Sequence, residues 1–445
     1  MRPTEGMSAS HTDTTSDQRS GRFAGRRVLA LGTFDSFIRT AAVIGRLFEA
    51  EGASLRIAAL AASATTGQLS SRQLRAGGVH ESVPVLAAEA LVASRLFRDA
   101  HVVIAVIDGG RARELFLACA AADLAREASR PIIAVASPGV ALTEHLQGFM
   151  SRAPADVLCF NAEGERVLYY AAAEEIGVDP TNAIVTGLLG LDVRPRAGSP
   201  SGQRSIAFFE QPVIPARRMQ RTHLLAGLID LARRSPDVEV LVKLRHARDE
   251  TAHHQTRFHL EDIARELFAR GGRPANLNFT HEPAHDLLDR VSLAATVSST
   301  VAVEAMARGV PTRIVSDFGV SEALGTSYFI GSGCFAALAD LSPDLPAVAK
   351  SDWLSKRSGA AADPEALLSQ CAALIGGQER LGSALPLRPL SPAYGSAGWL
   401  GYALGIGGPV AVHAPHLLDR PARGLGFVGA VAARLRQARR PPTRR

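Results

Sequence analysis

The sequence predicts an α/β protein made of two doubly wound domains that follow one another and face a cleft. Short apolar runs alternate with helical stretches from residue 27 onward, a pattern typical of a parallel sheet with helices on both faces. The alternation breaks once, at the Pro-, Gly- and Arg-rich linker 195–204, and then restarts. A chain of 445 residues is long enough for two such domains.

The first expected domain covers residues 26–194, and the polar segment 1–25 before it is expected to be a disordered tail. Its opening strand is the apolar run 27–34. Asp35 follows, where it can cap a helix whose apolar residues recur at helical spacing. Further strands are expected at 55–60, 101–107, 131–136, 157–160 and 183–185.

The second expected domain covers residues 205–385, and 386–445 is expected to be an extension with a basic tail. Its strands are expected at 205–209, 238–244, 277–279, 293–297 and 312–315, with helices near 217–234, 259–270, 284–290 and 300–308. In open parallel sheets, ligands bind beyond the carboxyl ends of the strands. The loops that follow strands are therefore the predicted site.

Charge and cysteine usage exclude several classes of protein. The net charge is +6, but eight arginines lie beyond Asp419, so the basic balance reflects a tail and argues against a nucleic-acid-binding domain. The four cysteines form no CxxC pair, which argues against a structural zinc site and fits a reducing compartment. The N-terminus lacks a signal-peptide pattern, and the glycine-rich stretch 394–412 is a poor membrane span. We therefore expect a cytoplasmic protein.

One candidate site is the serine loop, which we define as Ser298, Ser299 and Thr300. It ends a predicted strand, and a short helix begins directly after it. Hydroxyls and free backbone N–H groups at a helix N-terminus favour an anion such as phosphate. Glu304 lies too far along the helix to complete a capping box, so it is expected to be free to face a ligand. The plain alternative is that Ser and Thr only cap the helix.

A second candidate site is the cationic loop, defined as Lys243, Arg245 and His246. It ends another predicted strand of the second domain and could hold a phosphate from the side opposite the serine loop. The plain alternative is a solvated strand end. Several histidines lie between His246 and His285, but their spacing matches no standard metal-ligand set, so no metal is predicted.

The two loops, with Glu304, resemble the His-Pro and Ser-Ser motifs of bacterial sialyl- and polysialyltransferases and of capsule Kdo transferases. These are two-domain GT-B glycosyltransferases with Rossmann-like domains. Residues 185–192 resemble the TG-x-P-x-x-D end of their first domain, and 209–212 the opening strand of their second. The resemblance covers about residues 27–341 and extends to an actinobacterial group of glycosyltransferases.

The resemblance implies that His246 and the serine loop bind the phosphate of a nucleotide-sugar, with Glu304 as a ribose contact. Ala247 and Leu189 stand where those relatives carry proline, so a CMP-linked donor is one option among several. The sequence contains no DxD triplet, which fits a donor phosphate held by protein groups instead of a divalent ion. No cofactor is expected.

The base that deprotonates the acceptor hydroxyl is expected from the first domain, where two aspartates end predicted strands. Asp108 resembles the last acidic position of the acidic-acidic-glycine motif of sialyltransferases. Asp35 is the second candidate, although it could equally be only a helix cap. The sequence does not rank one above the other.

Taken together, these features predict a metal-independent glycosyltransferase. It would move a sugar from a nucleotide-sugar to a cell-envelope glycan or lipid-linked acceptor. The basic segment 424–440 could touch anionic lipid at the inner membrane face. Two alternatives stay open: a sugar-nucleotide epimerase of the same fold, and a nucleotide-binding scaffold without catalytic activity.

Overall fold

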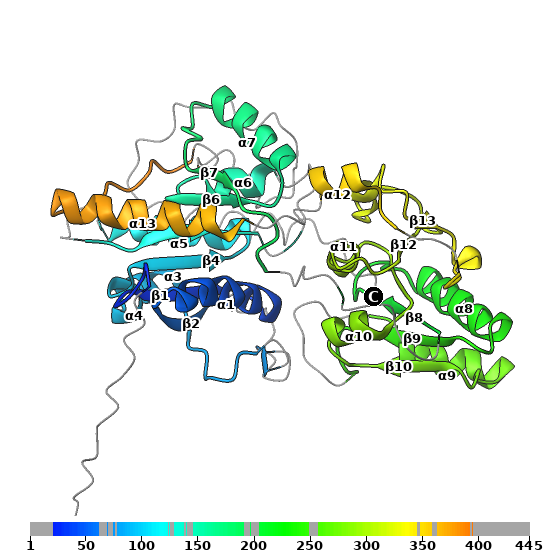
Figure 1. Cartoon of the computed structure of the whole chain (residues 1–445). Coiled ribbons are helices and arrows are strands. Elements are labelled where there is room, and N and C mark those ends of the chain that lie inside the picture. The colour runs from blue at the N-terminus through cyan, green and yellow to red at the C-terminus, as the bar shows by residue number, and fades with distance from the viewer. Residues whose placement is uncertain are drawn as a thin grey trace, which may run out of the picture.

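The computed structural model describes residues 21–61, 69, 74–75, 78–122, 124, 129–137, 139, 146–190, 196, 204–248, 257–344, 348–357, 363–391 and 394. These residues form two parallel sheets flanked by helices, which confirms the predicted fold class (Figure 1). The tail predicted before residue 21 and the basic segment 424–440 lie outside the described residues. Within the described ranges, no helix is long and apolar enough to cross a bilayer.

The first sheet has seven parallel strands in the order β3-β2-β1-β4-β5-β6-β7. Successive residues of β1 pack into opposite core clusters: Leu29 and Leu31 join one, and Val28 and Ala30 join the other. Both faces are therefore buried, as an uninterrupted apolar run predicts. The strands are β1 (Arg27–Gly32), β2 (Ser54–Leu60), β3 (Val85–Leu86), β4 (Val102–Val106), β5 (Ile132–Val135), β6 (Val157–Phe160) and β7 (Ala183–Val185). The helices are α1 (Asp35–Ala50), α3 (Ala88–Ala93), α4 (Arg95–Arg98), α5 (Gly109–Ala121), α6 (Leu146–Arg152) and α7 (Glu163–Glu175).

The second sheet has six parallel strands in the order β10-β9-β8-β11-β12-β13. Its strands are β8 (Ser205–Phe209), β9 (Glu239–Lys243), β10 (Leu277–Thr280), β11 (Leu293–Thr296), β12 (Thr312–Val315) and β13 (Phe335–Ala336). Its helices are α8 (Arg218–Arg234), α9 (Leu260–Gly271), α10 (Ala284–Arg290), α11 (Val301–Ala307) and α12 (Ser351–Arg357), with short 3-10 turns at Thr326–Phe329 and Leu338–Asp340.

Both sheets have a point where the direction of strand addition reverses. The chain adds β2 and β3 on one side of β1 and then places β4 on the other side. It repeats this pattern around β8, with β9 and β10 on one side and β11 on the other. In sheets of this kind, ligands bind at the carboxyl ends of the strands beside the reversal.

The last described helix, α13 (Pro364–Leu381), packs on the first sheet. The expected second domain at 205–385 included this helix, so that boundary is wrong. Its buried residues Leu367, Leu368, Cys371 and Ile375 belong to the same core cluster as β1 and α1. In Figure 1, α13 (orange) lies with the elements of the first sheet, whereas α12 lies with the second. The sequence indicates an apolar helix face but not which sheet that face covers.

The disordered tail was expected to cover residues 1–25, but residues 21–25 are part of the ordered structure. Phe23 is only 1% exposed and packs against Phe48 of α1, with ring centroids 4.8 Å apart. The N–H of Phe23 also donates to the carbonyl of Glu51. An aromatic side chain in the segment 21–25 therefore anchors it to the first domain.

The carboxyl edges of the two sheets face each other. Gly139, beyond the end of β5, lies so close to the serine loop that a Cβ on it would be 2.8 Å from Thr300 Oγ1. Asn161, beyond the end of β6, holds this glycine by donating its amide N–H to the Gly139 carbonyl at 2.8 Å. Leu188, beyond β7, is buried among side chains of the second domain, including Trp353.

Candidate active site

The structure brings the cationic loop and the serine loop to one edge of the second sheet, on either side of β8. Phe209 pairs with Lys243 of β9, and the Thr296 hydroxyl of β11 donates to the Phe209 carbonyl at 2.8 Å. The three strands thus end at the same level. Strands lie about 4.8 Å apart, so the exits of β9 and β11 are about 10 Å from each other. His246 and Ser299 therefore lie at the same edge.

Within the serine loop, Ser298 is held by the residues around it. Its N–H donates to Gln211 Oε1 at 2.9 Å, and its hydroxyl donates to the Leu324 carbonyl. Ser299 Oγ accepts the N–H of Val301 at 3.3 Å, whereas Thr300, which holds the capping position of α11, makes no capping hydrogen bond with its side chain. The backbone N–H groups of Ser299 and Thr300 have no partner among the described residues. An anion could therefore bind the backbone here more directly than the hydroxyls.

Glu304 is not free to face a ligand, which corrects the expectation from its spacing. It is 8% exposed, and its carboxylate lies 3.8 Å from Nη1 of Arg308, four residues along the chain. Arg308 also pairs with Asp289 of α10. Glu304 and Arg308 are four residues apart, a spacing that brings two side chains together on one face of a helix.

The three members of the cationic loop have different environments. Lys243 Nζ donates to the carbonyl of Leu244 at 2.7 Å. The Arg245 side chain is exposed, whereas His246 is only 5% exposed and its ring lies 6.1 Å from that of His259. Arg245 is therefore the member whose charge reaches the surface.

A buried ion pair that the sequence analysis missed links these loops. Arg221 of α8 is fully buried and pairs with Glu210, which directly follows β8. The other oxygen of Glu210 accepts the N–H of Arg245 at 3.2 Å. The guanidinium also donates to backbone carbonyls of Gln211 (3.1 Å), Pro212 (3.3 Å), Pro215 (3.5 Å) and Phe258 (2.7 Å). One arginine thus holds the β8 exit and the segment before α9.

This network could have been noticed in the sequence. Arg221 stands at helical spacing from Leu224, Leu225 and Leu228, so it falls on the apolar face of its helix. A charge on such a face needs a buried partner. Glu210 at the end of an apolar strand is the matching signal.

Both candidate bases lie at the facing edge of the first sheet, just beyond the ends of the adjacent strands β1 and β4. Asp108 caps α5 by accepting the N–H of Arg111 at 3.1 Å. The alternative role of Asp35 as a cap of α1 is wrong, because the capping position belongs to Phe34 and Asp35 is the first helical residue. Both aspartates are partly exposed.

A buried arginine lies below Asp108. Arg152 of α6 donates to the Ile107 carbonyl at 2.7 and 3.1 Å and so fixes the turn that carries Asp108. Burial lowers the pKa of Arg152 to about 10, and the charge of Asp108 opposes that shift. In the described part of the chain, no three His, Cys, Asp or Glu side chains converge as a metal site would require.

Two α/β domains that present switch-point loops to each other define the GT-B class of folds. The chain belongs to the family described as "Putative glycosyltransferase (DUF6716)", whose model matches residues 28–374. This finding confirms the resemblance noted from the sequence. No curated protein matches the chain in sequence.

Several solved structures are similar to the chain at low sequence identity. S. aureus MnaA, solved with UDP, is 10% identical over 86% of this chain and 97% of its own, with a TM-score of 0.50. UDP-GlcNAc 2-epimerase from Methanocaldococcus jannaschii is 12% identical over 76% and 98%, with a TM-score of 0.48. An α,α-trehalose-phosphate synthase from Burkholderia vietnamiensis is 10% identical over 79% and 96%, with a TM-score of 0.43.

Proposed function

We propose that this protein is a glycosyltransferase that moves a sugar from a nucleotide-sugar donor to a cell-envelope glycan or a lipid-linked acceptor. Membership of the glycosyltransferase family supports the reaction class. One observation carries the proposal. The exits of β9 and β11 flank β8 at the switch point, and this edge faces the one that carries Asp35 and Asp108.

The second domain binds the donor phosphate in this proposal. The N–H groups of Ser299 and Thr300, which have no partner among the described residues, lie at the positive end of α11, and the exposed Arg245 follows β9 on the other side of β8. Gln211 and Glu210 hold the two loops in place. The protein itself would therefore meet the phosphate charge, without a metal ion.

The first domain supplies the base. Asp108 or Asp35 takes the proton of the acceptor hydroxyl as its oxygen forms a bond to the anomeric carbon. The bond from that carbon to the donor phosphate oxygen breaks, and its electron pair leaves with the nucleotide. N–H groups aimed at that phosphate stabilise the charge that develops there.

We propose that the reaction takes place in the cytoplasm. All four cysteines are buried and free, as a reducing compartment favours. The basic segment 424–440 would bring the enzyme to anionic lipid, where a lipid-linked acceptor lies.

Thermal unfolding of the full chain against a panel of nucleotides and nucleotide-sugars tests the proposal. One nucleotide class should stabilise the protein, by about 2.7 kcal/mol at a hundredfold excess over Kd. Asp108→Asn and Asp35→Asn should both keep this shift, and only the variant that lacks the base should lose transfer. If no nucleotide shifts the melting temperature, the proposal fails. Donor conversion without acceptor to an isomeric sugar would instead show the epimerase.

A further inference from the structure

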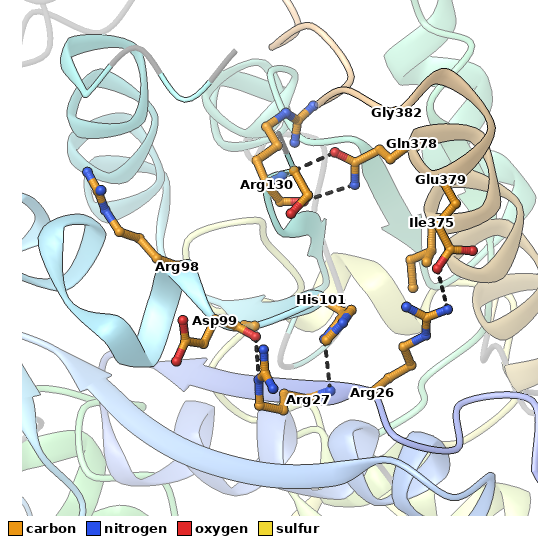
Figure 2. Close-up of a pocket in the computed structure, with 12 residues that line it drawn as sticks. Arg26, Arg27, Arg98, Asp99, His101, Arg130, Ile375, Gln378, Glu379 and Gly382 are labelled. Carbon is orange, nitrogen blue, oxygen red and sulfur yellow. Dashed lines mark hydrogen bonds and ion pairs between the residues drawn. The ribbon is translucent and has the colours of Figure 1, made fainter. Parts of the chain in front are cut away.

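A polar cavity lies at the other end of the first sheet, away from the facing edges. Its volume is about 400 Å³, and it is bounded by the starts of β1 and β4, the segment before β5 and the last turns of α13 (Figure 2). Cavities of about 300–1,000 Å³ commonly hold small molecules. The charged and imidazole side chains of its lining include Arg26, Arg27, Asp99, His101, Arg130 and Glu379.

The lining carries more positive than negative charge. Four arginines line the cavity, against two carboxylates, Asp99 and Glu379. Arg130 is neutralised by Asp156, with two bonds at 2.7 and 2.6 Å. Arg26 is paired with Glu379, whose side chain is 54% exposed and can therefore be displaced into solvent.

Arg27 has no carboxylate partner among the described residues. Its Nε donates to the Asp99 carbonyl at 2.6 Å, which fixes the side chain but leaves the two terminal nitrogens without a partner in this part of the chain. Figure 2 shows Arg26, Arg27 and His101 together on one side of the cavity, with the Arg98 guanidinium turned away. A guanidinium held in this way can donate from its two terminal nitrogens to two oxygens of one phosphate group.

The pKa of His101 responds to the charges that line this cavity. Its Nδ1 accepts the backbone N–H of Arg27 at 3.1 Å, so in the neutral ring Nε2 carries the proton and can donate to an anion. Burial lowers the pKa of His101, and the charges of Arg26 and Arg27 lower it further. An anion bound between these groups would reverse part of that shift.

We propose that this cavity binds a small phosphorylated metabolite, with its phosphate group between the guanidinium groups of Arg27 and Arg26 and beside His101. The phosphate would compete with Glu379 for Arg26. Glu379 belongs to α13, the helix that returns to the first sheet after the second domain. Occupancy of the cavity would therefore change how the last turns of α13 are held.

The experiment uses the full chain with 13C-labelled histidine and inorganic phosphate as the probe, at constant ionic strength. The His101 signal is identified by its loss in His101→Gln. Phosphate should shift this signal saturably and raise the pKa of His101. Arg27→Gln should weaken the response about tenfold or more, because a hydrogen bond to a charged group exceeds the tenfold increment of binding energy. Arg270→Gln, exposed on α9 of the second domain, should leave it unchanged.

Three results would overturn the proposal: no saturable shift at millimolar phosphate, an equal response in Arg27→Gln, or the same shift with chloride. The outcome is independent of the active-site proposal, because the reporter lies at the opposite edge of the first sheet. Nucleotide binding at the facing edges can fail while His101 still responds to phosphate, and the reverse also holds.

Discussion

Replacing Arg221 with Met removes the buried cation that joins three segments of the second domain, and we expect a loss of about 3–5 kcal/mol in the free energy of unfolding. The exposed fractions of the Arg221 and Glu210 side chains are 0% and 2%, so water cannot take over the role of the arginine. Glu210 would keep the N–H of Arg245 as its one other described donor. Four backbone carbonyls also lose their donor, which moves the expected cost toward the upper end of the range.

Urea unfolding followed by the fluorescence of Trp353, in a Trp399→Phe background, measures this loss in the second domain. The matched control is Arg218→Met on the same helix, because Arg218 pairs with Glu266 at the surface with side chains 53% and 52% exposed. That control should lose less than about 1 kcal/mol. Equal midpoints for the two variants would refute the reasoning. Adding Glu210→Leu to Arg221→Met should restore part of the stability, since no charge then stays buried.

Three further predictions concern the facing edges and the thiols. Gly139→Ala places a Cβ 2.8 Å from Thr300 Oγ1, so isothermal titration calorimetry should show weaker nucleotide binding, whereas Gly164→Ala on α7, which has open space around it, should bind normally. Burial raises the pKa of Cys119 and Cys159 to about 12, so both thiols should resist a thiol reagent at pH 8 in the native protein and react in urea. The same shifts predict that stability falls as the pH rises from about 9, the ordinary thiol value, toward 12, because the unfolded thiols ionise first. Rapid labelling of native Cys159, or stability that rises over this pH range, would contradict the burial argument.

The fold was predictable because each buried strand appears in the sequence as a short apolar run. Residues 205–209 and 183–185 form strands at the expected positions, and 284–290 forms the expected helix. The two-residue edge strand Val85–Leu86 was missed, since two residues are too few to carry a strand pattern of their own. Alternating apolar runs predict a parallel sheet, but they do not predict which short strands pair at its edges.

The site was predictable only in part. Strand ends could be placed at one edge from the order of elements, and the structure puts His246 and Ser299 there. Side-chain partners could not be placed, because they depend on contacts between distant segments. Glu304 meets Arg308, and Arg221 meets Glu210 only after α8 has packed on the sheet.

The position of α13 affects how the protein can be made and divided. The first domain is discontinuous along the chain, so during translation its hydrophobic face stays open until residues 364–381 have left the ribosome, after the whole second domain. A fragment that ends at residue 190 would carry that exposed face and tend to aggregate. A fragment of 205–385 would include α13 with its apolar face exposed. A fragment that ends before residue 364 is therefore the better choice for expressing the second domain alone.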